Sequence, residues 1–148
     1  PGIVPDRAKA ELRRRIVERA LENGLTEDEM FADDPARGRM SDLRVWQETY
    51  ANNPDAPDFG YGVVNGDDIP EKFVEHISVP EGTQTIILAS DGYPTQALRN
   101  SLEETERELK AIERTDPLGI GETKSVRMNM PRRDQAAADD RTYIKIVP

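Results

Sequence analysis

Hydrophobic and polar residues follow different periods in the two parts of this chain. Over residues 6–23 the apolar positions recur every fourth residue and form one stripe, which predicts an amphipathic helix. Asp6 is its expected N-terminal cap, and Gly24 is expected to end it. Directly afterwards, Thr26 and Glu29 have the spacing of a capping box, which predicts a short second helix.

The charged residues of the first helix can pair with one another. Glu11 with Arg15, and Arg14 with Glu18, stand four positions apart, and each pair stabilises a helix by roughly a few tenths of a kcal/mol. We therefore expect the arginine run at residues 13–15 to be a solvated helix face rather than a binding patch.

A third helix is expected after a loop at residues 33–40. Ser41 or Asp42 would cap it, and it would end before the Asn-Pro dipeptide at residues 53–54, because a residue that precedes proline is pushed out of the helical region. The only tryptophan, Trp46, lies on its apolar face and is expected in the core.

The remainder of the chain is patterned for strands. Three short apolar segments separated by turn residues predict an antiparallel meander: residues 61–64, 73–79 and 84–90. The third segment contains four consecutive apolar residues, 86–89, followed by Ser90, Asp91 and Gly92. Such a run reads as a buried strand that delivers one carboxylate to the sheet edge, with Gly92 permitting the turn.

One more helix and one more strand are expected towards the end. Ser101 and Glu104 form a capping box, and the helix they open should end at Asp116 and lie on the surface of the sheet. Residues 118–139 show no recognisable element and are expected to form a long loop. Residues 142–147 alternate apolar and polar positions and should complete the sheet.

These patterns predict an α+β fold in which helices cover an antiparallel sheet. A chain of 148 residues suits a single domain, or a fragment of one. Residues 1–53 would be mainly helical, and residues 54–148 would hold the sheet and one long helix.

Composition narrows the range of functions. A net charge of −9 argues against a general surface for nucleic acid or anionic membranes, and no cysteine is present for disulfides or thiolate chemistry. No apolar run approaches the roughly 20 residues of a membrane span. We therefore expect a cytoplasmic protein without nucleic-acid or membrane partners. With His76 as the only histidine, serine-histidine catalysis and histidine-based zinc sites are disfavoured.

Carboxylates are the remaining candidates for chemistry. Asp91 directly follows the strand at residues 86–89, and Asp139 and Asp140 precede the closing strand. If these strands are neighbours, their acids could hold one hard cation such as Mg²⁺ or Mn²⁺, which prefer oxygen ligands. The pattern alone leaves open the more common alternative, in which both acidic segments are ordinary structural turns.

Two segments resemble motifs of a known family. Residues 86–94, I-I-L-A-S-D-G-Y-P, are similar to the strand motif L-[IV]-L-[AC]-[ST]-D-G of the metal-dependent serine/threonine protein phosphatases of type 2C. Residues 139–146, D-D-R-T-Y-I-K-I, are similar to that family's closing motif, D-[ND]-x-T-x-[IV]-x-[VI], and follow in the same order. A looser similarity at residues 59–66 is compatible with a divergent bacterial branch.

The resemblance implies a hydrolase acting on phosphoserine or phosphothreonine in proteins. In that family a water activated at a Mg²⁺ or Mn²⁺ centre attacks phosphorus, within an α-β-β-α sandwich. Carried over to this chain, Asp91 and Asp139 would be metal ligands and Gly92 the turn. Asp140 stands where the family usually has asparagine, and it would contact the ligand residues rather than the metal ion.

The resemblance covers roughly residues 59–147. The family's N-terminal metal motif, D-G-H-G-G, and its phosphate-binding arginine have no counterpart in this sequence. The simplest expectation is the C-terminal part of a phosphatase, incomplete on its own, that binds metal once the N-terminal part of the same protein is supplied. The alternative is a degenerate relative that serves as a non-catalytic interaction or regulatory domain.

Overall fold

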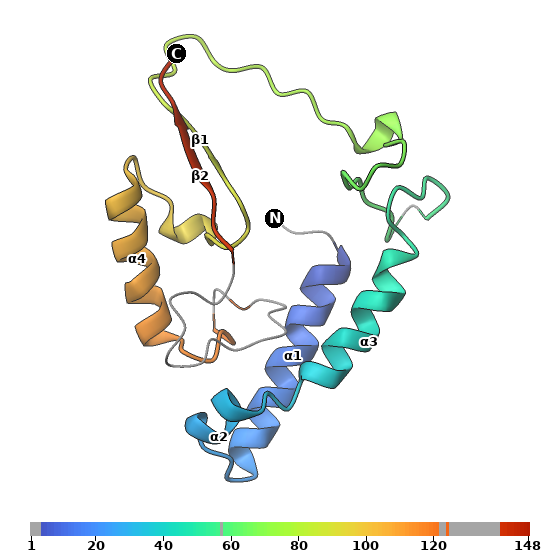
Figure 1. The fold of residues 1–148 in the computed structure, drawn as a ribbon, viewed down its shortest axis with the longest axis vertical. Coiled ribbons are helices and arrows are strands. Elements are labelled where there is room, and N and C mark those ends of the chain that lie inside the picture. Colours follow the sequence, from blue (N-terminus) through green and yellow to red (C-terminus); the bar gives the residue numbers. More distant parts are fainter. Residues whose placement is uncertain (1–3, 57, 122–123, 125–139) are drawn as a thin grey trace.

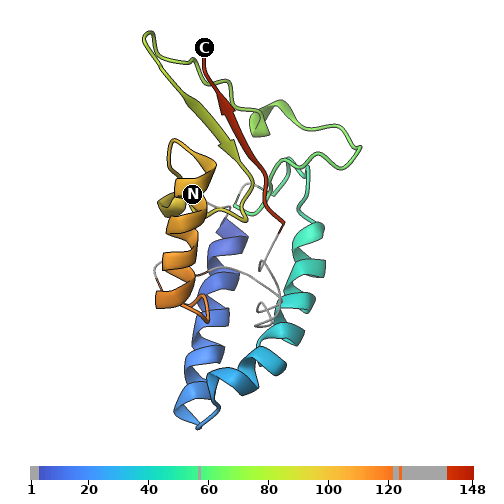
Figure 2. The same cartoon turned by 60° about the vertical axis from the view of Figure 1, so that its left-hand side comes forward.

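The computed structural model describes residues 4–56, 58–121, 124 and 140–148. Within them it contains four α-helices, two strands and two short 3-10 helices: α1 (Val4–Glu22), α2 (Glu27–Ala32), α3 (Arg37–Glu48), η1 (Glu71–Phe73), β1 (Ile86–Ala89), η2 (Thr95–Ala97), α4 (Leu102–Thr115) and β2 (Tyr143–Ile146). The fold is therefore α+β, as the sequence predicts. The two strands form a ribbon that extends beyond the helices (Figure 1; Figure 2).

Helix α1 begins at Val4, so the prediction that Asp6 caps it is wrong. Asp6 lies in the first turn, where a negative charge suits the helix dipole. Its carboxylate pairs with Lys9 at 3.1 Å and accepts a hydrogen bond from the side chain of Gln47 at 3.2 Å. These contacts join the start of α1 to α3.

The turn between α1 and α2 follows the local signals in the sequence. Gly24 has a φ of +90°, and the amides of Gly24 and Leu25 donate to carbonyls of the last turn of α1. Glycine adopts this left-handed conformation without steric cost, which ends the helix. The capping box of Thr26 and Glu29 is also confirmed.

Helix α3 begins earlier than the sequence indicates. It starts at Arg37, so Ser41 and Asp42 lie inside the helix and cap nothing. Asp34 organises the start instead, because its Oδ1 accepts a hydrogen bond from the backbone N–H of Ala36 at 2.8 Å. Helix α3 therefore starts next to Asp34, and not at Ser41 or Asp42, the residues with the capping preference in the sequence.

Trp46 is not a core residue. Its side chain is 43% exposed, and its ring contacts those of Tyr50 and Phe59 with centroids 4.9 Å and 5.7 Å away. The apolar face of α3 therefore ends in a partly exposed aromatic cluster.

Arg13 is buried, which contradicts the expectation of a fully solvated arginine run. It is only 1% exposed, and its Nη2 lies 3.3 Å from Oδ2 of Asp34. Its Nη1 donates to the carbonyl oxygens of Leu118 at 2.9 Å and Gly119 at 3.2 Å. One guanidinium thus ties α1 to the α2–α3 connection and to the segment after α4.

The predicted meander does not form among the described residues. Only its last segment contains a strand, β1, and the segments at 61–64 and 73–79 are irregular apart from η1 and one isolated parallel bridge between Ala51 and Tyr61. Asn52 supplies one physical reason. Its side-chain amide donates to the carbonyl of Val63 and accepts from the N–H of Val63, both at 2.9 Å. A side chain thus satisfies the backbone groups that a neighbouring strand would have paired.

Strand β1 covers the apolar run at 86–89, which is shorter than the predicted segment 84–90, and it lacks the predicted burial. It pairs antiparallel with β2, from Ile86 opposite Ile146 to Ala89 opposite Tyr143. Leu88 is 52% exposed, and Ile144 opposite it is 49% exposed. Among the described residues β2 is its only hydrogen-bonded neighbour, so the strand is part of a two-stranded ribbon rather than a buried sheet.

Two small apolar cores hold the described chain together. The first lies between α1, α2 and the segment after α4: Val17, Ala20, Met30 and Leu118. The second lies between α4, the segment after β1, and β2: Tyr93, Ala97 and Leu109, with Leu98, Ile112 and Tyr143 against them. Helix α4 therefore packs on the end of the ribbon, where β1 finishes and β2 starts, rather than across the face of a sheet.

Candidate functional site

The pairing of β1 with β2 brings the two motif segments to one place. The pairing continues beyond the strands, because the N–H of Ser90 donates to the carbonyl of Thr142 at 3.0 Å. The hydroxyl of Ser90 accepts from the N–H of Thr142 at 2.9 Å and lies 3.4 Å from the carbonyl oxygen of Asp140, to which it donates. We call residues 90–92 together with 140–142 the acidic edge.

Gly92 sets the spacing within the acidic edge. A Cβ placed on it would lie 2.4 Å from the carbonyl oxygen of Asp140 and 2.7 Å from Cγ of Arg141. The sequence predicts that Gly92 serves a turn, but its φ is not in the left-handed region. It is the close approach of the two backbones that requires glycine here.

The structure describes Asp91 but not Asp139, the other predicted metal ligand. Asp91 is exposed in the turn after β1, and Asp140 is exposed shortly before β2, which begins at Tyr143. The structure thus brings the Asp91 turn against Asp140, while Asp139 lies outside the described residues. Within the described part of the chain no group of three or more His, Cys, Asp or Glu residues could hold a metal ion. Mg²⁺ commonly takes only one or two protein carboxylates and keeps several waters.

Behind the acidic edge lies a polar cluster that the sequence did not reveal. The hydroxyl of Tyr93 donates to Oε1 of Glu106 at 2.5 Å, and Nη1 of Arg141 lies 3.4 Å from Oε2 of Glu106. The guanidinium of Arg141 stands 5.6 Å from the centroid of the Tyr93 ring. Burial raises the pKa of Tyr93, and the hydrogen bond to Glu106 raises this pKa further.

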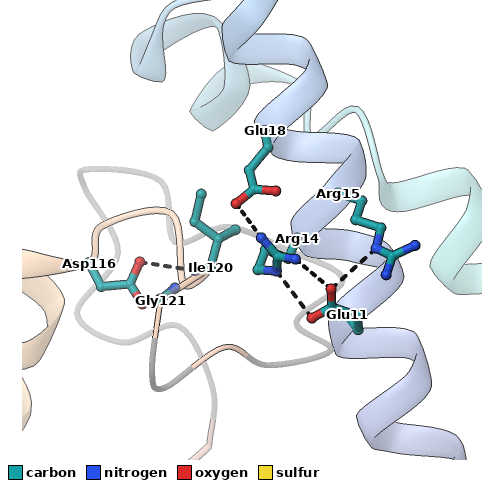
Figure 3. Close-up of polar contacts among 7 residues, drawn as sticks. All are labelled: Glu11, Arg14, Arg15, Glu18, Asp116, Ile120 and Gly121. Carbon is teal, nitrogen blue, oxygen red and sulfur yellow. Dashed lines mark hydrogen bonds and ion pairs between the residues drawn. The ribbon is translucent and has the colours of Figure 1, made fainter.

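A second polar cluster lies on α1 (Figure 3). Arg14 contacts Glu11 and Glu18, each at 2.5 Å, and Arg15 contacts Glu11 at 3.2 Å, so both predicted pairs are confirmed. The hydrogen bond from Arg14 to Glu11 lowers the pKa of Glu11 to about 2, and Arg15 lowers it too. These side chains satisfy one another on a solvated helix face, and exposed pairs of this kind contribute little stability.

Asp116 organises the turn after α4 in the same view (Figure 3). Its carboxylate accepts from the backbone N–H groups of Ile120 at 2.9 Å and Gly121 at 2.8 Å. This turn carries Leu118 into the first core. The expected loop at 118–139 is thus anchored at its start, and most of the rest lies outside the described residues.

The remaining candidates do not add to the site. His76 is exposed, with its Nε2 4.0 Å from Glu71, and it lies in no strand. None of the described helices has both the length and the apolar character needed to cross a membrane.

Comparisons of this chain with protein-family models, with curated proteins and with solved structures found no match. The predicted relation to type-2C phosphatases therefore rests on the two sequence segments alone.

Proposed function

We propose that this chain supplies one part of the metal centre of a type-2C-like protein phosphatase. Asp91 and Asp139 would be carboxylate ligands of Mg²⁺ or Mn²⁺, and the substrate would be a protein carrying phosphoserine or phosphothreonine. One observation carries this proposal. Two segments far apart in the sequence resemble two motifs of one family, and the end of β1 lies against the start of β2 at the acidic edge. In this proposal the ribbon belongs to one sheet of an α-β-β-α sandwich.

The residues at the acidic edge suit a hard cation. Asp91 is exposed on a turn, so its carboxylate oxygens are open to an ion and its waters. Asp139 is bonded to Asp140, whose backbone is in contact with Gly92. The donor set is oxygen only, which favours Mg²⁺ or Mn²⁺ over softer metals.

The residues of this chain would bind the metal ion and fix the relative position of the two segments of the acidic edge. When bound, Mg²⁺ or Mn²⁺ would acidify a water and offset charge on the phosphoryl oxygens. Asp91 would bind the ion from the end of β1. Ser90 and Gly92 would fix the position of residues 140–142. Ser90 does so through its hydrogen bonds to residues 140 and 142, and Gly92 through its close contact with the backbone of Asp140.

The proposed site is incomplete on this chain. In a two-metal centre the ions lie about 3.5–4 Å apart, and two carboxylates do not suffice to organise both. The D-G-H-G-G motif that supplies further ligands in the family is missing from this sequence. We therefore expect weak or no phosphatase turnover from this chain alone, and turnover after the N-terminal part is supplied.

Calorimetric titration with Mn²⁺ tests the proposal. The unsubstituted chain should give a binding heat that the Asp91→Asn variant loses. Asp68→Asn is the matched control, because it makes the same change at another exposed aspartate outside the acidic edge. An equal binding heat for Asp91→Asn and the unsubstituted chain would contradict the metal site and favour the non-catalytic alternative.

A further inference from the structure

Two Asn-Gly dipeptides occur in this sequence, at residues 23–24 and 65–66, and both are exposed. In such a dipeptide the backbone nitrogen of the glycine can attack the side-chain carboxamide of the asparagine, because glycine has no side chain to hinder the approach. We propose that Asn65 is a site of spontaneous deamidation, whereas Asn23 is protected by its place at the end of α1. This inference is independent of the proposed metal site.

The reaction consumes only water. The backbone nitrogen of Gly66 loses its proton to solvent base and forms a bond to Cγ of Asn65. The bond between Cγ and Nδ2 then breaks, and this nitrogen takes up a proton and leaves as ammonia. Water opens the resulting five-membered succinimide ring at either of its two carbonyl groups. The product carries aspartate or isoaspartate at position 65 and therefore one more negative charge.

The two dipeptides are matched in exposure and in backbone conformation. Gly24 has a φ of +90° and Gly66 a φ of +100°. A Cβ added to either glycine would meet nothing within 4 Å, so both turns are equally open. A difference in rate between the two asparagines of the folded chain therefore comes from their hydrogen bonds.

The attacking nitrogen is held at the first dipeptide and not at the second. The N–H of Gly24 donates to the carbonyl of Leu21 at 2.9 Å, and the N–H of Asn23 donates to that of Arg19 at 3.1 Å. Attack by the Gly24 nitrogen requires that its bond to the helix end be broken. In contrast, the N–H of Gly66 donates no hydrogen bond within the part of the chain that the structure describes.

The carboxamide of Asn65 is also held by donors that suit the reaction. Its Oδ1 accepts from the backbone N–H of Asp67 at 3.1 Å and from Nδ2 of Asn52 at 3.2 Å. Negative charge develops on this oxygen as the Gly66 nitrogen adds to Cγ, so both donors stabilise the transition state. Nδ2 of Asn65 donates to Oδ2 of Asp67 at 2.8 Å, which fixes the orientation of the amide.

Peptide mapping of the full chain by mass spectrometry tests the proposal. One sample is incubated folded in mildly alkaline buffer, and a second is incubated in the same buffer with urea. Trypsin separates the two sites, because Asn23 lies in the fragment 20–37 and Asn65 in the fragment 45–72. In the folded chain Asn65 should be converted about tenfold faster than Asn23, since breaking one backbone hydrogen bond slows a step by up to this factor. In urea both dipeptides are solvated, and the two rates should be similar.

Asn65→Gln identifies the reacting residue. Its longer side chain cannot close a five-membered ring, so the mass gain of fragment 45–72 should disappear. Asn53 in the same fragment precedes Pro54, which has no N–H for this attack. Persistence of the mass gain in Asn65→Gln would overturn the assignment. The proposal is also overturned if folded and urea samples give the same ratio of rates, or if the folded chain does not convert Asn65.

Discussion

Replacing Gly92 with alanine should force the two segments of the acidic edge apart. The added Cβ would lie 2.4 Å from the carbonyl oxygen of Asp140 and 2.7 Å from Cγ of Arg141. Nonbonded carbon atoms attract near 3.5–4.0 Å, so contacts this short are strongly repulsive. The nearest atom belongs to the backbone, so relief requires a shift of the chain before β2 and not a rotation of a side chain. Overpacking of this kind costs about 1–3 kcal/mol.

Gly38 provides a control substitution that should raise the stability of the chain instead of lowering it. It is the second residue of α3, with nothing within 4 Å of an added Cβ. Alanine should stabilise the first turn of α3, by at most the gain of about 0.5–1 kcal/mol seen in a helix interior, because it loses less conformational freedom than glycine. Urea unfolding followed by circular dichroism measures both variants, and thermal unfolding should move by about 2–4 °C per kcal/mol for a chain of this size. A Gly92→Ala variant as stable as the unsubstituted chain would refute the close approach.

Two further predictions concern the ion pairs of α1. Arg13→Met should destabilise the chain by about 3–5 kcal/mol in urea unfolding, because it leaves the buried carboxylate of Asp34 uncompensated, while Arg15→Met at an exposed position should stay within about 0.5 kcal/mol. An equal effect of the two variants would contradict the burial of Arg13. Glu11 has a lowered pKa of about 2 against an ordinary 4.5, so its stabilising effect is present above pH 4.5 and is lost as the pH falls towards 2. The thermal midpoint of the unsubstituted chain should therefore exceed that of Glu11→Gln at pH 6 in low salt and converge with it near pH 2; a constant difference would count against this assignment.

Features set by neighbouring residues could be predicted from the sequence. The capping box of Thr26 and Glu29 and the stop at Gly24 depend on contacts within a few residues, and both appear as expected. The extent of β1 follows from its apolar run, which ends at a polar turn. The ion pairs at helical spacing on α1 belong to the same class, because the helix itself brings their side chains together.

Features set by distant residues could not be predicted. Arg13 has acids at helical spacing beside it, so a solvated face was the natural interpretation. Its actual partners are Asp34 and the carbonyls of Leu118 and Gly119, far along the chain. Likewise, the side chain of Asn52 takes the place of a strand beside Val63, which no alternation of hydrophobic residues reveals.

The candidate site, too, could be predicted only where its features depend on residues that are close in the sequence. Its two segments could be singled out because each is contiguous in the sequence, and the antiparallel pairing of β1 with β2 brings the end of one strand against the start of the other. The contacts of Glu106 could not be predicted, since an acid early in a helix already has an explanation in the helix dipole. Only the packing of α4 on the end of the ribbon shows that its carboxylate faces Tyr93 and Arg141.

Substitutions at the acidic edge should change the stability of the chain and its affinity for Mn²⁺ by different amounts. Gly92→Ala displaces the backbone, so both quantities should fall. Glu106→Gln keeps the backbone contact and removes a partly exposed ion pair, so stability should fall by roughly 0–1 kcal/mol. Asp91→Asn removes an exposed carboxylate and should change affinity with stability held within about 0.5 kcal/mol. An acidic turn that binds no cation would show only differences in stability among these variants, so measuring both quantities on each variant decides between a metal-binding edge and a structural one.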